Sequence, residues 1–323
     1  MKKRWCSFVL VMCGLAATAI AQDDAPTYAE RLGWPKGSRV LIIHEDDAGM
    51  SHGQNQGAIN ALEYGVLTSV STMMPCPWVP EFAGYLKEHP NVDNGLHLTL
   101  TSEWHNYRWA PLAGKAAVPG LVDPEGCMWS NVISVVTHAS AEEVEKEIRA
   151  QIDRAETLGI PITHLDTHMG TLYAKPEYTE AYIKVGIEKQ IPIMIMGGHM
   201  QFIAEDEQDI VRQLKVKELA EKVWQGGLPV LDDLLNRTYG WKTFAEKKQN
   251  LMDALRQMKP GVTMVIMHCA VPDQDWPLFT SSSETRLNDT RVMTDPEFKK
   301  FIEDEKFILS TWREMMERRK KVN

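Results

Sequence analysis

The 323-residue sequence has few cysteines, no excess of basic residues, and no long apolar run after its N-terminal segment. Two of the five cysteines fall within that segment, so only Cys76, Cys127 and Cys269 remain in the body of the chain. Three widely spaced cysteines form at most one disulfide, which excludes a disulfide scaffold and leaves open whether any pair is bonded. Acidic residues outnumber basic ones by 44 to 35, which argues against nucleic acid as a partner.

Residues 1–21 have the pattern of a cleaved secretory signal, with a basic start at Lys2, Lys3 and Arg4, an apolar run and small residues at the end. The apolar run is too short for a membrane span, which needs about 20 apolar residues. Cleavage changes the formal net charge from −9 to −12, because the segment carries three basic and no acidic residues. We therefore expect an exported protein, periplasmic or extracellular, with no integral membrane segment after cleavage.

The remaining residues, 22–323, contain no linker, repeat or low-complexity stretch, so we expect a single domain. Short apolar, β-branched runs alternate with longer amphipathic stretches, which is typical of repeated βα units. The clearest helix begins at Ser140, which can cap Glu143, and ends at Gly159. The expected strands are residues 39–44, 69–73, 92–98, 162–166, 192–196 and 262–268. This order predicts a buried parallel sheet with outer helices, either closed as a barrel or open and doubly wound.

Residues able to bind a metal or transfer a proton lie at the C-terminal ends of four of these expected strands. Parallel α/β folds build their sites at that end, where strand ends and the loops that follow them converge. The residues concerned are His44, Asp46, Asp47, His97, Asp166, His168 and His268.

Some of these residues also have a purely structural explanation. Asp46 and Asp47 could cap a helix or lie in a solvated turn, which Gly49 would permit. A lone histidine in an apolar strand, such as His97, is more often a hydrogen-bonded core residue than a ligand. Taken singly, these residues are weak indications of function.

The segment 164–168 is more specific, because His164, Asp166 and His168 alternate along an expected strand and so share one face. Three titratable side chains on a buried face are costly unless they are paired or bind a metal. Two imidazoles and a carboxylate, with one position open to solvent, form a metal site that activates water.

Together these segments resemble the YdjC-type carbohydrate deacetylases, a family that includes diacetylchitobiose deacetylase and is related to the polysaccharide deacetylases. Residues 44–49, His-Glu-Asp-Asp-Ala-Gly, are similar to the family's Asn-Ala-Asp-Asp-Phe-Gly. Residues 95–101 match its Gly-Leu-His-Leu-Thr-Leu-Thr without a change, and residues 164–168 match His-Leu-Asp-Ser-His with threonine for serine. Residues 267–270 resemble its Met-Cys-His-Pro strand end.

The resemblance implies an α/β fold, an irregular (β/α) barrel of the polysaccharide-deacetylase type. It also implies a metal-dependent hydrolase that removes acetyl groups from an N-acetylated mono- or oligosaccharide. The implied ligands of one divalent metal are Asp47, His97 and His168. Asp46 would be the base that activates water, His268 the acid that protonates the leaving amine, and His164 and Asp166 would orient the ligands. Imidazole with carboxylate suits zinc best, with magnesium, manganese or cobalt as alternatives.

The departures from the family lie around the expected substrate. His44 and Glu45 replace Asn-Ala, and either add a proton-transfer group or merely fill space. Trp104, Arg108 and Trp109 follow a rim strand, and aromatic faces and guanidinium groups suit sugars. The alternative for the two tryptophans is that they anchor the loop.

Two other functions remain compatible with the sequence. The same metal and water would serve a carbohydrate O-acetyl esterase. A metal-binding or sugar-binding protein without turnover is the second alternative, although such a protein would need neither Asp46 as a base nor His268 as an acid. A homo-oligomer is also compatible with the sequence.

Overall fold

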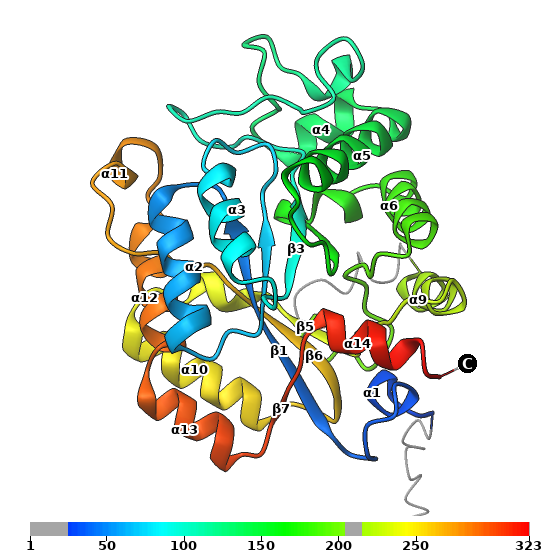
Figure 1. Ribbon diagram of the computed structural model, residues 1–323, viewed down its shortest axis with the longest axis vertical. Helices are drawn as coiled ribbons and strands as arrows, with labels where there is room; N and C mark the ends of the chain where they lie inside the picture. The colour runs from blue at the N-terminus through cyan, green and yellow to red at the C-terminus, as the bar shows by residue number, and fades with distance from the viewer. Residues whose placement is uncertain (1–24, 204–214, 323) are drawn as a thin grey trace, which may run out of the picture.

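The computed structural model describes residues 25–203 and 215–322, so the expected signal at residues 1–21 lies outside the described residues. Within the described residues, seven parallel strands form one curved sheet, in the order β4-β3-β2-β1-β6-β5 with β7 beside β1 (Figure 1). The strands are β1 (Arg39–Ala48), β2 (Ser69–Thr72), β3 (Asn94–Leu98), β4 (Leu165–Thr167), β5 (Asp233–Leu235), β6 (Gly261–Met267) and β7 (Ile308–Leu309). The predicted α/β class with a parallel sheet is confirmed.

Strand β1 is the centre of the sheet. It pairs with β6 from Arg39 to Glu45, and on its other edge with β7 near its start and β2 near its end. Its alternate side chains enter two hydrophobic clusters, Val40 and Ile42 in one, Leu41 and Ile43 in the other. Burial on both faces explains why this strand is a continuous apolar run instead of an alternating one.

The curved sheet forms a half-barrel whose edge strands are β4 and β5, and the segment 192–197 lies between these two edges. The predicted regular strand at residues 192–196 is wrong in detail, because the segment makes only single parallel bridges, Ile193 to Leu165 and Met196 to Leu231. Pro192 has no N–H to donate to a ladder, which limits regular pairing at this point. The backbone of the segment still bonds to β4 on one side and to Leu231 on the other, so an irregular barrel results.

Helices cover the outside of the sheet (Figure 1). One group contains α2 (His52–Tyr64), α3 (Val79–Glu88), α10 (Phe244–Arg256), α12 (Ser283–Met293) and α13 (Pro296–Asp304). The other contains α5 (Ala141–Leu158), α6 (Pro176–Lys189) and α9 (Val216–Gln225). The remaining shorter helices are α1 (Tyr28–Arg31), α4 (Val132–His138), α11 (Trp276–Phe279) and α14 (Trp312–Arg319), with 3-10 turns η1 (Pro119–Leu121), η2 (His168–Tyr173) and η3 (Arg237–Gly240).

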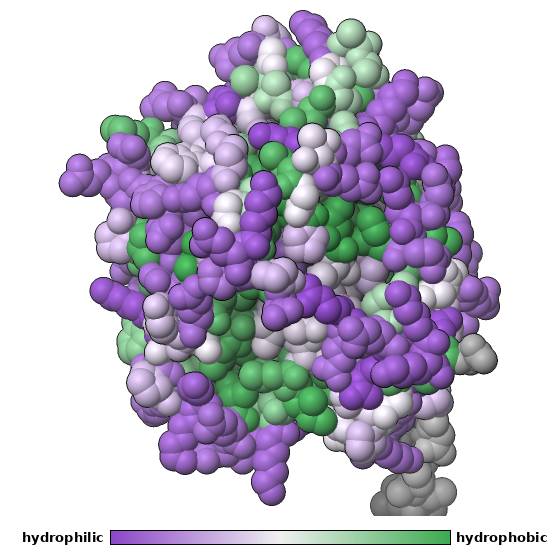
Figure 2. Space-filling model, in the orientation of Figure 1, coloured by the Kyte–Doolittle hydropathy of each residue, from purple (hydrophilic) through white to green (hydrophobic). Residues whose placement is uncertain are grey.

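The limits of α5 follow the sequence closely. Ser140 and Glu143 form a reciprocal capping box, and Gly159 ends the helix with a φ of 69°. The predicted inner face is fully buried, at Val144, Ile148, Ile152 and Ala155. Apolar side chains gather in such interior faces. On the outside, Figure 2 shows hydrophilic side chains over most of the visible surface, with apolar ones between them.

Two observations bear on the expectations about cysteines and membranes. Cys76, Cys127 and Cys269 are all free thiols, so the described residues contain no disulfide. No helix in the described ranges combines the length and apolar character needed to cross a membrane.

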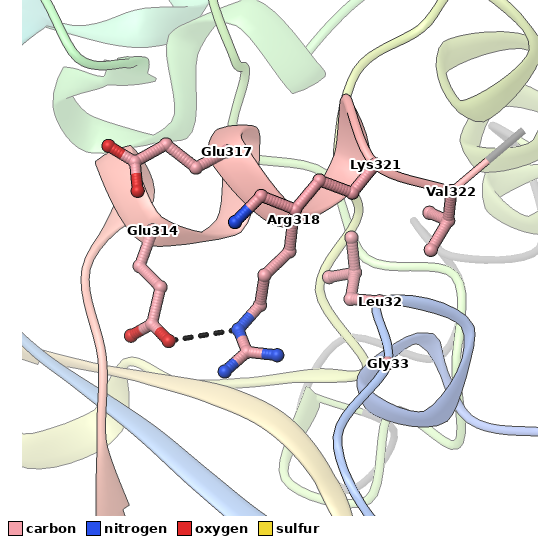
Figure 3. Close-up of a pocket in the computed structure, with 7 residues that line it drawn as sticks. All are labelled: Leu32, Gly33, Glu314, Glu317, Arg318, Lys321 and Val322. Carbon is pink, nitrogen blue, oxygen red and sulfur yellow. Dashed lines mark hydrogen bonds and ion pairs between the residues drawn. The ribbon is translucent and has the colours of Figure 1, made fainter.

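A groove of about 300 Å³ lies between α14 and the residues that follow α1 (Figure 3). Its lining contains both charge signs, and Glu314 and Arg318, one turn apart on α14, are paired with each other at 2.9 Å. The backbone of α14 is bonded at its start to Asp93, next to the first residue of β3. The groove is therefore beside the N-terminal ends of the strands, away from the carboxylates and histidines at their C-terminal ends.

Candidate active site

The end of β1 brings two adjacent carboxylates to the same side. Asp47 has a φ of 68° and Gly49 a φ of 85°, so the strand turns at this point, and Asn55 accepts the N–H of Gly49 at 2.6 Å. The oxygens Asp46 Oδ2 and Asp47 Oδ1 consequently lie 3.7 and 3.3 Å from Nε2 of His97. In a regular strand the two side chains would point to opposite faces.

Asp47, His97 and His168 form a compact triangle of buried donor atoms. Asp47 Oδ1 lies 3.3 Å from His97 Nε2 and 3.2 Å from His168 Nδ1, and the two imidazole nitrogens are 3.2 Å apart. The three residues come from β1, from β3 and from the first position of η2. Three chain segments that are distant in sequence thus meet at one point.

Carboxylates hold both imidazoles of the triangle from behind. His97 Nδ1 is 2.7 Å from Asp166 Oδ1, and His168 Nε2 is 2.8 Å from Glu103 Oε1. A carboxylate accepts a hydrogen bond, so in each ring the proton is assigned to the nitrogen that faces it. His97 Nε2 and His168 Nδ1 then remain as electron-pair donors, which is the arrangement by which metal-bound histidines are oriented.

Arg286 determines which oxygen of Asp47 is available. Its guanidinium is ion-paired with Asp47 Oδ2 at 2.7 Å, whereas Oδ1 faces the two imidazole nitrogens at 3.2 and 3.3 Å. Although burial disfavours the charged carboxylate, the positive charge of Arg286 and the two histidines hold the pKa of Asp47 well below its usual range. Asp47 therefore presents one ionised oxygen to the triangle.

The donor set fits a divalent metal. Four ligands placed tetrahedrally about 2.0 Å from zinc are about 3.3 Å apart, and the three observed separations are 3.2 to 3.3 Å. Burial alone would lower the pKa of His168, but the carboxylates of Glu103 and Asp47 raise it to about 9. The negative charge around the triangle thus favours a positive charge at this place. Asp47, His97 and His168 are also one of three groups of ligand-type side chains found in the described residues.

Asp46 and His268 lie together beside the triangle. Asp46 Oδ2 is 3.8 Å from His268 Nε2, and His268 directly follows the end of β6. Burial lowers the pKa of His268 to about 4, so its ring is neutral near pH 7 in the resting protein. A base and a neutral imidazole thus share one side of the candidate metal site.

His44, His164 and Asp166 lie one layer further in. His44 Nε2 is 2.9 Å from Asp166 Oδ2 and 3.3 Å from Asp46 Oδ1, so this ring connects the two carboxylates. His164 is fully buried, stacks on Trp312 with ring centroids 5.1 Å apart, and its pKa is lowered by burial. His44 is also fully buried, with Ser69 and Ser71 beside its ring nitrogens.

Three of the residues suggested for substrate contact have their polar groups bonded to other parts of the protein. Glu45 is buried and accepts hydrogen bonds from the Gln54 side chain and the Cys269 N–H, so its contacts are with the protein. Arg108 is paired with Asp123 at 2.7 Å inside its own loop. Trp109 is buried and donates to the Thr101 carbonyl at 2.8 Å.

Glu45 and Trp109 are enclosed and hydrogen-bonded by the protein, so neither has a free face for a sugar. His44 is equally enclosed, and its ring contacts the carboxylates of Asp46 and Asp166. Arg108 likewise has its charge neutralised by its own loop. Trp104 is partly exposed, packs on Phe279 of α11 with ring centroids 5.1 Å apart, and lies 5.9 Å from the guanidinium of Arg286, which places it close to the triangle.

Sequence reasoning did not select Glu103 or Arg286. Glu103 follows the family-like segment 95–101 by two positions, and the presence of a carboxylate near a strand end was an available signal. Arg286 lies in α12, nearly 240 residues after Asp47, and no local pattern marks it. Only the fold brings these two residues to the triangle.

Glu103→Gln should weaken binding of a divalent metal by about 10- to 100-fold, because a neutral amide holds the Nε2–H of His168 less strongly than a carboxylate does. The measurement is a titration of metal into the apoprotein against a competing chelator. Glu125→Gln, at an exposed position of the same loop region, is the control and should leave affinity unchanged. Equal affinities of the two variants would contradict the orienting role of Glu103.

Comparison with known sequences gives one family and several curated relatives. A family model described as YdjC-like protein matches residues 40–304. A carbohydrate deacetylase of Thermus thermophilus is 31% identical over 294 residues, which cover 89% of this chain and 97% of that protein. A chitooligosaccharide deacetylase of Yersinia enterocolitica is 24% identical over 278 residues, covering 85% and 98% of the two chains.

Comparison with solved structures supports the fold. A protein of Enterococcus faecalis, described as a proposed cellobiose-phosphate cleavage protein, superposes with a TM-score of 0.71. Its sequence is 24% identical, and the match covers 85% of this chain and 98% of that one. The similarity extends over almost the whole described barrel.

Proposed function

Since this chain belongs to the YdjC-like protein family, we propose that it is a metal-dependent hydrolase that removes the acetyl group from an N-acetylated sugar. Three relatives over most of their length are named carbohydrate or chitooligosaccharide deacetylases, which supports this substrate class. The observation that carries the proposal is the triangle of Asp47, His97 and His168 with Asp46 and His268 beside it.

The metal would be held by Asp47 Oδ1, His97 Nε2 and His168 Nδ1. When bound, a divalent ion there polarises the acetyl carbonyl and favours ionisation of water. Two imidazoles with one carboxylate would suit zinc best, with magnesium, manganese or cobalt as alternatives.

The protein's own groups would move the protons. Asp46 takes a proton at Oδ2 from the water that adds to the acetyl carbon. His268, whose Nε2 is 3.8 Å from that oxygen, takes this proton from Asp46 and gives it to the sugar nitrogen as the C–N bond breaks, which returns Asp46 to its ionised form. The second proton of the water is released when the new carboxyl group ionises and is taken up by the amine, so the products are acetate and a protonated amine, and atoms and charges balance.

The other side chains would keep this geometry fixed. Asp166 and Glu103 hold the two imidazoles, and Arg286 confines Asp47 to one donor oxygen. We further propose that the protein is exported, which is supported by the basic and apolar pattern of residues 1–21.

The proposal is tested by measuring acetate released from a panel of N-acetylated and O-acetylated sugars by purified protein loaded with zinc, magnesium, manganese or cobalt. We expect release from N-acetylated sugars that stops when a chelator is added and resumes when metal returns. Release from O-acetyl sugars alone would identify an esterase. Binding of sugar without any release would identify a non-catalytic protein.

His268→Ala should reduce cleavage of an N-acetyl sugar by about 10² to 10⁴-fold, because a leaving amine must gain a proton. An activated acetyl ester, whose alkoxide or phenolate leaves more easily, should lose much less. Rates on both substrates are compared together with thermal melting. Equal losses on both substrates with a lowered melting temperature would instead assign His268 a structural role.

A further inference from the structure

The ring of His268 is not oriented in the way the rings of His97 and His168 are. A carboxylate holds each of those two rings, whereas Nδ1 of His268 is buried with no hydrogen-bond partner in the described part of the chain. Tyr239 packs edge-on against the ring, with centroids 5.0 Å apart. The position of Nε2 must therefore be set largely through the main chain that carries the residue.

That main chain is held from two sides by buried carboxylates. Asp289 Oδ2 accepts the N–H of His268 at 2.9 Å, and Glu45 Oε2 accepts the N–H of Cys269 at 2.7 Å. Both carboxylates are fully buried. Glu45 belongs to the same strand as Asp46, so one of these bonds ties the histidine directly to the strand of the base.

Asp289 is itself fixed by an ion pair inside the protein. Its Oδ1 is bound by the Nζ of Lys247, which is fully buried in α10 and also donates to Thr285 Oγ1 at 3.0 Å. Removing two charges from water is costly, and well-packed apolar residues of similar size often serve stability equally well. Stability alone is therefore a weak reason for an ion pair at this place.

The helix that carries Asp289 also contacts the metal-binding triangle. Arg286, one turn before Asp289 on α12, bonds Asp47 Oδ2 at 2.7 Å and Gln54 Oε1 at 3.1 Å. Gln54 in turn donates to Glu45 Oε1 at 2.7 Å. A continuous set of buried polar contacts thus connects the main chain at His268 to Asp47 through one face of α12.

We propose that Asp289, which Lys247 holds in place, is a positioning residue for His268: it accepts the main-chain N–H of His268 and so sets the place of Nε2 relative to Asp46. The inference rests on the proposed function, in which His268 transfers a proton. A displacement of about 1 Å in such a group costs about 10²-fold in rate. The pair itself touches neither substrate nor metal.

Two double variants separate this role from simple support of the fold. Lys247→Met with Asp289→Asn removes both charges but keeps an amide oxygen able to accept the N–H of His268. Lys247→Met with Asp289→Leu removes both charges and the acceptor at nearly the same side-chain volume. Any effect of losing the buried ion pair is common to both variants. A difference between them in amide exchange or turnover therefore reports the hydrogen bond between the His268 N–H and residue 289.

The first readout is amide hydrogen exchange at His268 and Cys269, which needs no activity. We expect faster exchange at His268 in the Leu variant than in the Asn variant. The second is turnover of zinc-loaded protein, where the Leu variant should lose about 10- to 100-fold relative to the Asn variant on an N-acetyl sugar, and less on an activated acetyl ester. Metal content should be the same in both.

Equal exchange at His268 in the two variants would overturn the inference, whatever their rates. Equal losses on amide and ester, with equally lowered melting temperatures, would overturn it in favour of structural support. If the wild-type protein released no acetate from any sugar, the proposed function would fail while the exchange comparison still decided whether Asp289 holds His268.

Discussion

His97→Ala and His168→Ala proteins should each purify with almost no bound metal and turn over at least about 10³-fold more slowly than the wild type. Each replacement leaves only two of the three donors of the triangle, and a catalytic zinc site needs three protein ligands. A bound metal stabilises the transition state by several kcal/mol, and each 1.4 kcal/mol corresponds to about tenfold in rate, so loss of the metal accounts for the lower turnover. The two variants should be indistinguishable in this respect, because His97 and His168 are equivalent corners of one triangle.

Metal content is measured by elemental analysis after dialysis, and affinity by titration against a chelator. His52→Ala is a matched control, because this histidine is half exposed, pairs with Glu81 and has no contact with the triangle. It should keep full metal content and rate. Wild-type stoichiometry and affinity in both the His97 and His168 variants would show that the metal, if any, binds elsewhere.

The fold was predictable where the local pattern was long and strong. The apolar run of β1, the capping box at Ser140 and the glycine at position 159 each gave the correct element, because capping chemistry and burial act over a few residues. The short strands β5 and β7, of three and two residues, carry too little periodicity to predict. The segment at 192–196 was misjudged because its apolar residues complete the barrel by isolated bridges.

The candidate site likewise contains residues that the sequence predicted and residues that it did not. The family-like segments selected Asp47, His97 and His168, and the structure brings these three side chains together. Glu103 and Arg286, which complete their surroundings, were missed because their role depends on contacts across 65 and 239 residues of chain. Arg108 and Trp109 were suggested from their side-chain type and their place after a rim strand, and neither property shows whether a side chain is already satisfied within its loop.

Asp46→Asn should keep the metal and the fold but lose about 10² to 10⁴ in turnover, because an amide cannot accept the proton that the carboxylate takes from water. Asp47→Asn makes the same chemical change one residue later and should have a different effect. It neutralises the donor that Arg286 keeps ionised, so the metal itself should be lost. The two neighbouring carboxylates are thereby assigned separate roles that one pair of isosteric variants can distinguish.

The decisive comparison is metal content measured beside rate in the same preparations. Asp46→Asn should combine near wild-type metal content with severe loss of turnover, and Asp47→Asn should lose both. The geometry supports this separation, because Asp47 Oδ1 is 3.3 Å from His97 Nε2 and 3.2 Å from His168 Nδ1, while Asp46 Oδ2 lies 3.7 Å from His97 on the side of His268. If Asp46→Asn turned over near the wild-type rate, Asp46 would have no part in proton transfer. If instead it lost its metal as Asp47→Asn does, Asp46 would have to be counted among the ligands, and the base would have to be sought in another residue.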